Sequence, residues 1–196
     1  MATHSNPLLT PEEYLEREYL SEFRNEYVDG EIFAMAGTSV DHSRIVVNIS
    51  RELSTQFRRG PCEVFVNDLR VKRADNRMYT YPDVGVVCGS ISVDKYKGTE
   101  TLSNPLIIFE VLSPSTEAYD RGLKFQRYQG IETLREYVLV SQETVLVERY
   151  LRQTNGEWLY SSLNTLEDSL HLVSAAATLK LSDIYERVFP TVEDSK

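Results

Sequence analysis

The sequence predicts an α/β fold in which a mixed β-sheet is flanked by helices, and three observations predict it. Segments with apolar residues at helical spacing alternate with short segments rich in β-branched and aromatic residues. Their order is helix, hairpin, helix, three or four strands, helix and further strands. No linker rich in Pro, Gly or Ser divides the 196 residues. We therefore predict a single domain over 1–196, with loose ends at about 1–9 and 190–196.

The first predicted helix and hairpin lie near the start of the chain. In TPEEYLEREYLSEF, Thr10 can cap a helix, Pro11 suits its first turn, and Glu13 completes a capping box. The stretch EYVDGEIFAMAG predicts a hairpin, because Asp29-Gly30 is a strong two-residue turn signal between extended segments.

Two further helices are predicted from periodicity and stop signals. One covers 41–59 and is stopped by Gly60-Pro61, and another covers about 117–128 and is closed by Gly130. The apolar residues of the longer helix recur at helical spacing and are Ile45, Val46, Ile49, Leu53 and Phe57.

The predicted strands lie between and after these helices. CEVFVNDLRVK, RMYTY, DVGVVC and LIIFEVL are rich in β-branched or aromatic residues, and the turn-like ADN and the polar loop GSISVDKYKGTETLSN separate them. After the third helix, REYVLVS and VLVERYLR predict two more strands, with WLYSSL and HLVS as weaker ones.

Composition limits the possible functions. Hydrophobic content of 41% and charged content of 26% are ordinary for a globular protein. The net charge of −9 argues against a non-specific nucleic-acid coat but is compatible with a local basic strip or a cation-binding acid cluster. No apolar run approaches the roughly 20 residues of a membrane span, and the start lacks a signal peptide, so we expect a cytoplasmic protein. Cys62 and Cys88 form no CxxC pair, and we expect reduced core thiols.

Two strands carry a carboxylate where the chain otherwise reads as buried. Asp83 follows a proline in YPDVGVV, and Glu110 ends the apolar run in PLIIFE. A buried carboxylate is costly unless it is paired or bound to a cation. If these strands are neighbours, the two acids converge at a common rim and offer the oxygen ligands that Mg²⁺ or Mn²⁺ prefers. A metal so placed can polarise a phosphoryl oxygen and activate a water.

These residues, in this order, resemble the Uma-two family, which lies within the PD-(D/E)xK restriction-endonuclease-like superfold. The resemblance rests on Pro82-Asp83, on the later strand ending in Glu110, and on EVLSPST followed by AYDRGLK. EYVDGEIFAMAG followed by DHSR, and REYVLVS after the third helix, are also similar. The similarity extends from about Pro11 to Phe189.

The resemblance implies a restriction-endonuclease-like core and a metal-dependent phosphodiesterase site. It implies Asp83 as the first metal ligand and Glu110 as the second. The lysine expected two residues after Glu110 is replaced by Leu112, and Lys124 in the following helix is the candidate substitute. A lysine beside the attacking water would stabilise developing anionic charge. Glu26 would add a further ligand or orient a metal-bound water.

Structural roles remain open for the same residues. Asp83 can be read as a turn acid bonded to backbone, and Glu110 as a strand-end acid paired with an arginine. Lys124 lies four residues after Asp120, the spacing of an ion pair on a helix surface.

Other polar side chains near these residues are expected to have structural roles. We expect His42 to pack at the start of its helix in preference to acting as a general base. Tyr119 and Tyr128 are expected in the core in preference to stacking on bases. Ser113 and Ser115 lack a histidine partner for nucleophilic work, and SPST caps the following helix.

Basic side chains leave two possibilities open. Arg121, Lys124 and Arg127 give the third helix a basic side, and Lys95 and Lys97 lie in the long polar loop. These residues either hold a nucleic-acid backbone or form an ordinary solvated surface.

The leading hypothesis is a Mg²⁺- or Mn²⁺-dependent endonuclease that hydrolyses phosphodiester bonds of DNA. One alternative is a relative that no longer cleaves and acts as a nucleic-acid-binding or oligomeric interaction module, which the pI of about 4.9 and the absent lysine favour. Another is a hydrolase of other phosphate esters. We also expect a homodimer, because symmetric dimers are the commonest oligomer, with Tyr150, Trp158 and Tyr160 at the candidate interface.

Overall fold

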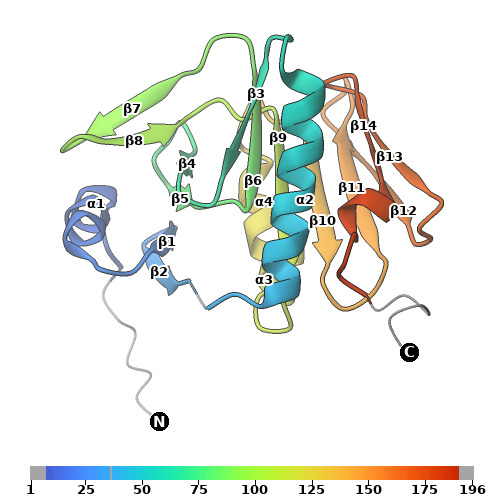
Figure 1. Ribbon diagram of the computed structural model, residues 1–196. Helices are drawn as coiled ribbons and strands as arrows, with labels where there is room; N and C mark the ends of the chain where they lie inside the picture. The colour runs from blue at the N-terminus through green and yellow to red at the C-terminus, as the bar shows by residue number, and fades with distance from the viewer. Residues whose placement is uncertain (1–7, 36, 190–196) are drawn as a thin grey trace.

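The computed structural model describes residues 8–35 and 37–189, which form two six-stranded sheets, a separate hairpin and several helices (Figure 1). The predicted α/β class is confirmed, although the strands are divided between two sheets where one was expected. Within the described residues, no helix has the length and apolar character needed to cross a membrane. The ends predicted to be loose lie outside the described residues, apart from Leu8 and Leu9.

The first sheet has the strand order β2-β1-β5-β4-β8-β7. Its strands are β1 (Asn25–Val28), β2 (Glu31–Ala34), β4 (Arg70–Lys72), β5 (Met78–Thr80), β7 (Val93–Tyr96) and β8 (Thr99–Leu102). The predicted turn at Asp29-Gly30 joins β1 to β2, with φ of 50° and 97°, the left-handed region that a tight hairpin turn requires. The N-terminal hairpin is therefore confirmed.

The prediction of a polar loop before the strand of Glu110 is wrong. This segment forms the antiparallel strands β7 and β8, joined at Lys97-Gly98 with φ of 47° and 88°. Because β7 is an edge strand whose central residues are exposed, it lacks the apolar alternation that identifies a strand in a sequence.

The second sheet has the order β12-β11-β10-β9-β6-β3. Its strands are β3 (Cys62–Val66), β6 (Val84–Cys88), β9 (Ile107–Leu112), β10 (Glu136–Ser141), β11 (Val147–Arg152) and β12 (Trp158–Leu163). The central strands β9 and β10 run parallel, and the predicted third helix provides the crossover between them. The other neighbouring pairs of this sheet are antiparallel.

The three predicted helices are all present. They are α1 (Pro11–Leu20), α2 (Val40–Phe57), and a third that is divided into α3 (Glu117–Tyr119), a π-helical turn (Asp120–Lys124) and α4 (Phe125–Tyr128). Both hydrogen bonds of the capping box between Thr10 and Glu13 form at α1. The hairpin of β13 (Ser169–Leu172) and β14 (Ala177–Lys180) and the short α5 (Leu181–Ile184) complete the fold. Of these, only β13 was predicted from the sequence.

Two apolar cores lie on opposite faces of the second sheet. Helix α2 covers one face, together with β13, β14 and α5, and α4 lies against the other (Figure 1). Strand β9 alternates between these cores, with Ile107, Phe109 and Val111 in the first and Ile108 and Leu112 in the second. Glu110 shares the period of the second set and therefore faces α4.

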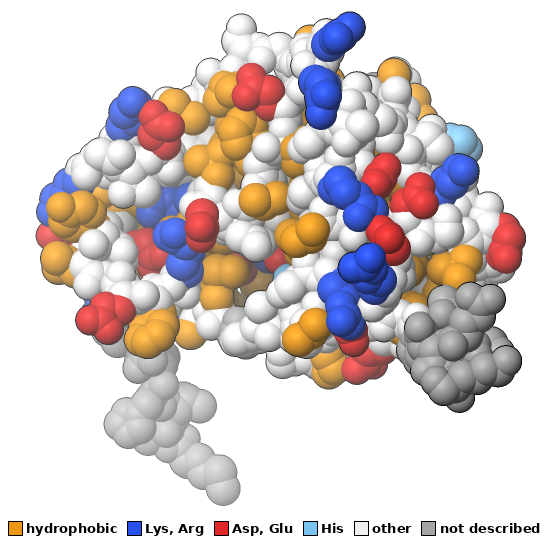
Figure 2. Space-filling view, viewed as in Figure 1, with side chains coloured by type: hydrophobic (Ala, Val, Ile, Leu, Met, Phe, Trp, Pro, Cys, Tyr) orange, Lys and Arg blue, Asp and Glu red, His pale blue; other side chains and the backbone are white. Residues whose placement is uncertain are grey.

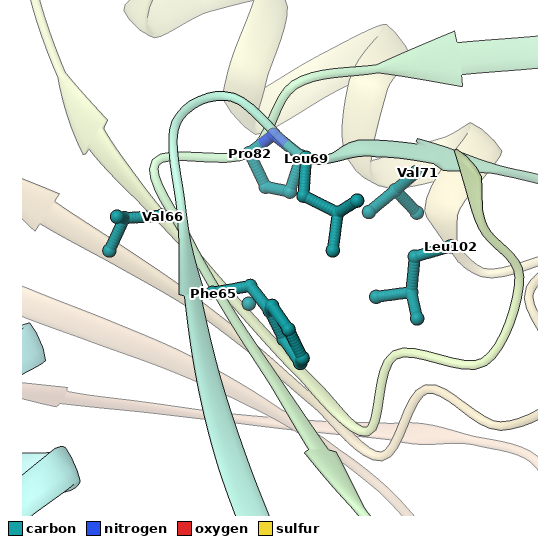
Figure 3. Close-up of a pocket in the computed structure, with 7 residues that line it drawn as sticks. Phe65, Val66, Leu69, Val71, Pro82 and Leu102 are labelled. Carbon is teal, nitrogen blue, oxygen red and sulfur yellow. The ribbon is translucent and has the colours of Figure 1, made fainter. Parts of the chain in front are cut away.

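The chain passes from the first sheet to the second at Tyr81–Asp83, between β5 and β6. Pro82 has no N–H to donate to a strand neighbour, which suits a position where pairing changes from one sheet to the other. Pro82 and Leu69 lie against each other at one side of a small apolar pocket, with Val71 and Leu102 close by (Figure 3). The packing leaves no room for a water molecule there.

The prediction that Cys62 and Cys88 are reduced thiols is wrong. The two residues form a disulfide. They are separated by 26 positions in the chain, but the antiparallel register of β3 and β6 places them directly opposite each other. The spacing of the two cysteines in the sequence does not predict their contact, because strand register sets it.

Candidate active site

Four separate parts of the fold contribute charged side chains to the junction of the two sheets. Glu26 lies on β1 of the first sheet, Asp83 in the crossover, Glu110 near the end of β9, and Lys124 in the π-helical turn. All four predicted site residues therefore come together. Such widened helical turns occur frequently at functional sites.

Asp83 is fixed beside Glu110 by strand register. The antiparallel pairing of β6 and β9 matches Val84 with Phe109, and one step further Asp83 lies across from Glu110. The Asp83 Oδ2 atom accepts a 2.7 Å hydrogen bond from the Val111 backbone N–H. Asp83 therefore has, in part, the backbone-bonded role that was considered for it from the sequence.

Lys124 links the remaining acids. Its Nζ atom lies 2.9 Å from Glu26 Oε1, 2.9 Å from Glu110 Oε1 and 3.5 Å from Asp120 Oδ1. The lysine and glutamate side chains are only 5–6% exposed, so the interaction with Asp120 is a buried contact and the surface ion pair considered from the sequence does not form. The arginine partner considered for Glu110 is likewise replaced by Lys124.

Each carboxylate uses one oxygen for protein partners. Glu110 Oε1 contacts the Lys124 ammonium and accepts a hydrogen bond from the Tyr128 hydroxyl. Glu26 Oε1 contacts the same ammonium and accepts from the Tyr81 backbone N–H. Asp83 Oδ2 accepts from the Val111 backbone N–H. Within the described residues, the second oxygen of each of these three acids has no hydrogen-bond or ion-pair partner.

The cluster holds more negative than positive charge. Burial raises the pKa of Glu110 well above its usual range, and the carboxylates of Asp120, Asp83 and Glu26 add to the effect while Lys124 opposes it. Burial by itself would lower the pKa of Lys124, but Glu110 and Glu26 outweigh burial and hold it well above the usual value. The ammonium therefore keeps its proton, and an additional cation or proton would relieve the excess of carboxylates.

The donors fit a hard divalent cation. In residues 8–35 and 37–189, no three or more His, Cys, Asp or Glu side chains are grouped as a metal cage. Mg²⁺ is commonly held by one or two carboxylates, with waters and substrate phosphate completing its shell. Asp83 and Glu110, each with one oxygen lacking a protein partner, are the side chains that would hold it.

His42 lies at the start of α2, as predicted, and its side chain is only 16% exposed. Its ring also has a polar neighbour that was not predicted. His42 Nε2 lies 3.3 Å from Asp83 Oδ2. Sequence reasoning considered this histidine without identifying its neighbour, because the contact joins a helix start to the crossover between sheets.

The other flanking residues follow their structural predictions in part. Tyr128 is fully buried in the second core, and Tyr119 is partly buried, with its ring 4.9 Å from the Phe33 ring. Ser113 Oγ lies within hydrogen-bond distance of Ser115 and Thr116, but no side chain caps the start of α3, so the predicted cap is wrong. The role of the Tyr128 hydroxyl was missed, although the four-residue spacing of Asp120, Lys124 and Tyr128 could have indicated a shared helix face.

The basic residues singled out from the sequence are all paired with acids. Arg121 contacts Glu117 and Glu148, and Arg127 Nε lies 2.5 Å from Asp29. Lys95 and Lys97 on the β7–β8 hairpin pair with Glu100 and Glu16, respectively. An uncompensated basic strip is therefore not formed by these five residues.

The aromatic residues proposed for a dimer interface lie on the outer strands of the second sheet. Tyr150 on β11 and Trp158 on β12 pack around Phe125, with ring centroids 4.3 and 5.4 Å away. Tyr160 is 50% exposed. The homodimer stays a prediction, and Tyr160 is the member of the set with most free surface.

The surface is hollowed between the part formed by α1 with the first sheet and the part formed by α2 (Figure 2). Hydrophobic side chains line much of this recess, and acidic and histidine side chains are visible within it (Figure 2).

Comparison with solved structures defines the class of protein first. The chain shares its fold with a crystal structure from Anabaena variabilis described as "a putative nuclease belonging to DUF820", with a TM-score of 0.76 and 18% sequence identity. The similarity covers 92% of this chain and 99% of that one. The protein thus has the mixed α/β fold of that structure.

Sequence comparison then gives the family. Residues 11–182 match the Uma2 family model, described as "Putative restriction endonuclease", and the chain belongs to that family. It is 38% identical over 179 residues to an uncharacterized Synechocystis protein, slr1290, covering 91% of this chain and 92% of the relative. A second uncharacterized Synechocystis protein, sll1609, is 35% identical over 167 residues, covering 83% and 92%. The predicted family is confirmed.

Proposed function

We propose that this protein is a divalent-metal-dependent endonuclease that hydrolyses phosphodiester bonds of DNA. One observation carries the proposal: Lys124 lies 2.9 Å from both Glu26 and Glu110, and Asp83 lies across the strand pair from Glu110. Burying several carboxylates around one ammonium costs folding free energy, and such clusters mark functional sites. The family's description, "Putative restriction endonuclease", supports DNA as the substrate.

Each residue has a distinct role in this proposal. Asp83 and Glu110 hold Mg²⁺ or Mn²⁺ through the oxygens that lack protein partners. A bound cation of this kind polarises a phosphoryl oxygen and lowers the pKa of a coordinated water. Lys124 stabilises negative charge on the reacting phosphate, and because its pKa is raised it acts as a cation and not as a base. Glu26 holds the lysine in place from the first sheet.

The test is cleavage of supercoiled plasmid by purified protein with Mg²⁺ or Mn²⁺. We expect nicked and linear products, and loss of at least about 100-fold in rate for Asp83→Asn and Asp83→Ala. Glu132→Ala, which removes an exposed acid from a loop, is the matched control and should cleave normally. Equal cleavage by wild type and both Asp83 variants would sink the assignment.

A second candidate is a nucleic-acid-binding module without cleavage. The observation that favours it is that Lys124 is already held by acids, while no cage of three metal-binding side chains is present in the described residues. This candidate predicts no heat of Mn²⁺ binding in calorimetry and a retained gel shift with DNA. Mn²⁺ binding that Asp83→Asn abolishes would favour the nuclease, and turnover of a small phosphodiester with no preference for DNA would indicate a different hydrolase.

A further inference from the structure

Tyr128 makes a polar contact that its predicted packing role does not require. Its hydroxyl donates a 2.9 Å hydrogen bond to Glu110 Oε1. The same hydroxyl lies 2.8 Å from Thr80 Oγ1, on the last residue of β5. A phenol has one hydrogen, so when Tyr128 donates to Glu110 it accepts from Thr80.

The geometry gives the direction of donation. The hydroxyl lies 2.9 Å from the carboxylate oxygen, and an ionised carboxylate can only accept hydrogen bonds. A hydrogen bond from a neutral donor to a carboxylate is among the stronger hydrogen bonds in proteins.

Two donors from successive turns of the third helix meet on one oxygen. Lys124 and Tyr128 are four residues apart, and both contact Glu110 Oε1. The terminal torsion of a glutamate is broad, so a free carboxylate would rotate between several orientations. Holding Oε1 at two points restricts that rotation and leaves Oε2 in a single position.

We propose that Tyr128 is a positioning residue that, with Thr80 behind it, orients the Glu110 carboxylate so that Oε2 is presented for the reaction. The proposal rests on the nuclease function given above. Thr80 belongs to the first sheet and Glu110 to the second, so the hydrogen-bonded chain Thr80–Tyr128–Glu110 also ties the acid to both sheets.

The ring and the hydroxyl of Tyr128 serve different purposes and can be separated. The ring packs in the second core, 5.4 Å from the Tyr137 ring. Tyr128→Phe keeps this packing and removes only the hydroxyl. Tyr185→Phe is the matched control, because Tyr185 is equally a buried tyrosine, its hydroxyl donates to Leu146 O at 2.8 Å, and it lies in the first core.

The experiment measures kcat and KM for plasmid cleavage, and thermal unfolding, in wild type and both variants. We expect the two variants to lose similar thermal stability. Tyr128→Phe should lower kcat about tenfold with little change in KM for DNA, whereas Tyr185→Phe should keep wild-type kinetics. Thr80→Val should lower kcat in the same direction by a smaller factor. Unchanged kcat in Tyr128→Phe would overturn the proposal.

A crystal structure of Tyr128→Phe separates this proposal from the nuclease assignment. We expect the Glu110 carboxylate to rotate or to take more than one orientation, while wild type shows one. If wild type neither binds Mn²⁺ nor cleaves DNA, the proposed function fails, and the orientation of Glu110 still decides the role of Tyr128. A Glu110 side chain that is unmoved in the variant would show that Lys124 alone positions it.

Discussion

At the residue scale, the ammonium of Lys124 is shared by the carboxylates of Glu26, Glu110 and Asp120. Excess negative charge remains at the junction of the two sheets, with Asp83 beside it. Charges buried in this way contribute little to stability, because desolvation offsets their attraction. Removing Lys124 would leave these carboxylates without their cation and should destabilise the fold, whereas neutralising one of the excess carboxylates does not carry that cost.

Lys124→Met should separate catalysis from metal binding. We expect kcat to fall about 100-fold, because a preorganised positive charge near the reacting phosphate is lost. Mn²⁺ affinity in calorimetry should stay equal or rise, since the ammonium no longer competes for Glu110. Lys95→Met, which breaks an exposed pair with Glu100, is the control and should leave both measurements unchanged. Wild-type turnover in Lys124→Met would remove the lysine from the mechanism.

Glu110→Gln tests the pH dependence that follows from the raised pKa of Glu110. A carboxyl whose folded-state pKa lies above its unfolded value stabilises the protein below the unfolded pKa, and this stabilisation is lost as pH rises through the folded pKa. Glutamine does not titrate. As pH rises from 5 to 8, the free energy of unfolding of the variant should therefore increase relative to that of wild type. Urea unfolding in the presence of EDTA measures the difference. A difference that is constant over this range would contradict the raised pKa.

At the scale of elements, α2 connects the site to the C-terminal part of the chain. The five apolar residues predicted for its buried face all lie in the first core. Its first turn brings His42 to Asp83, and Asn48 in its middle is bonded to the end of α5 and to the segment after it. The predicted helix and its buried face were therefore accessible from sequence, while these two polar contacts depend on how the helix is docked.

Asn48→Ala should loosen this docking. The Asn48 side chain is buried and its Nδ2 donates to the backbone oxygens of Ile184 and Glu186, each at 3.0 Å. Removing both bonds leaves carbonyl groups poorly satisfied and should lower the free energy of unfolding by about 1–3 kcal/mol. Urea unfolding measures the loss, with Ser54→Ala on the exposed side of α2 as the control. A loss equal to that of the control would show that water replaces the amide without penalty.

At the scale of the whole molecule, the two sheets are joined through the crossover at Tyr81–Asp83 and through the side-chain contacts of the site. The Cys62–Cys88 disulfide fastens β3, an edge strand of the second sheet, to β6, whose other end is preceded by Asp83. The bond closes a loop of 26 positions, which limits the freedom of the unfolded chain.

Removing this disulfide should destabilise the protein without abolishing its fold. The loop-entropy relation gives about 3–4 kcal/mol for a loop of this length. We expect Cys62→Ser/Cys88→Ser, or wild type with reductant, to unfold at lower urea concentration by this amount. Mass spectrometry after alkylation under non-reducing conditions should find no free thiol in wild type. Two alkylated cysteines would contradict the bond.

The sequence by itself located the elements with clear caps, turns or periodicity, and two acids of the candidate site. Capping residues, turn signals and helical periodicity act over a few neighbouring positions, so α1, the N-terminal hairpin and α2 could be located directly. Asp83 and Glu110 were identifiable because a carboxylate within an apolar strand requires a partner.

Only the tertiary structure decided how the strands are divided between two sheets, that the two cysteines meet, and which side chains surround Glu110. These contacts join residues far apart in the chain, and strand register and helix docking set them. A shift of one residue in the pairing of β6 with β9 would turn the acids to opposite faces, because successive strand residues alternate between the two sides of a sheet.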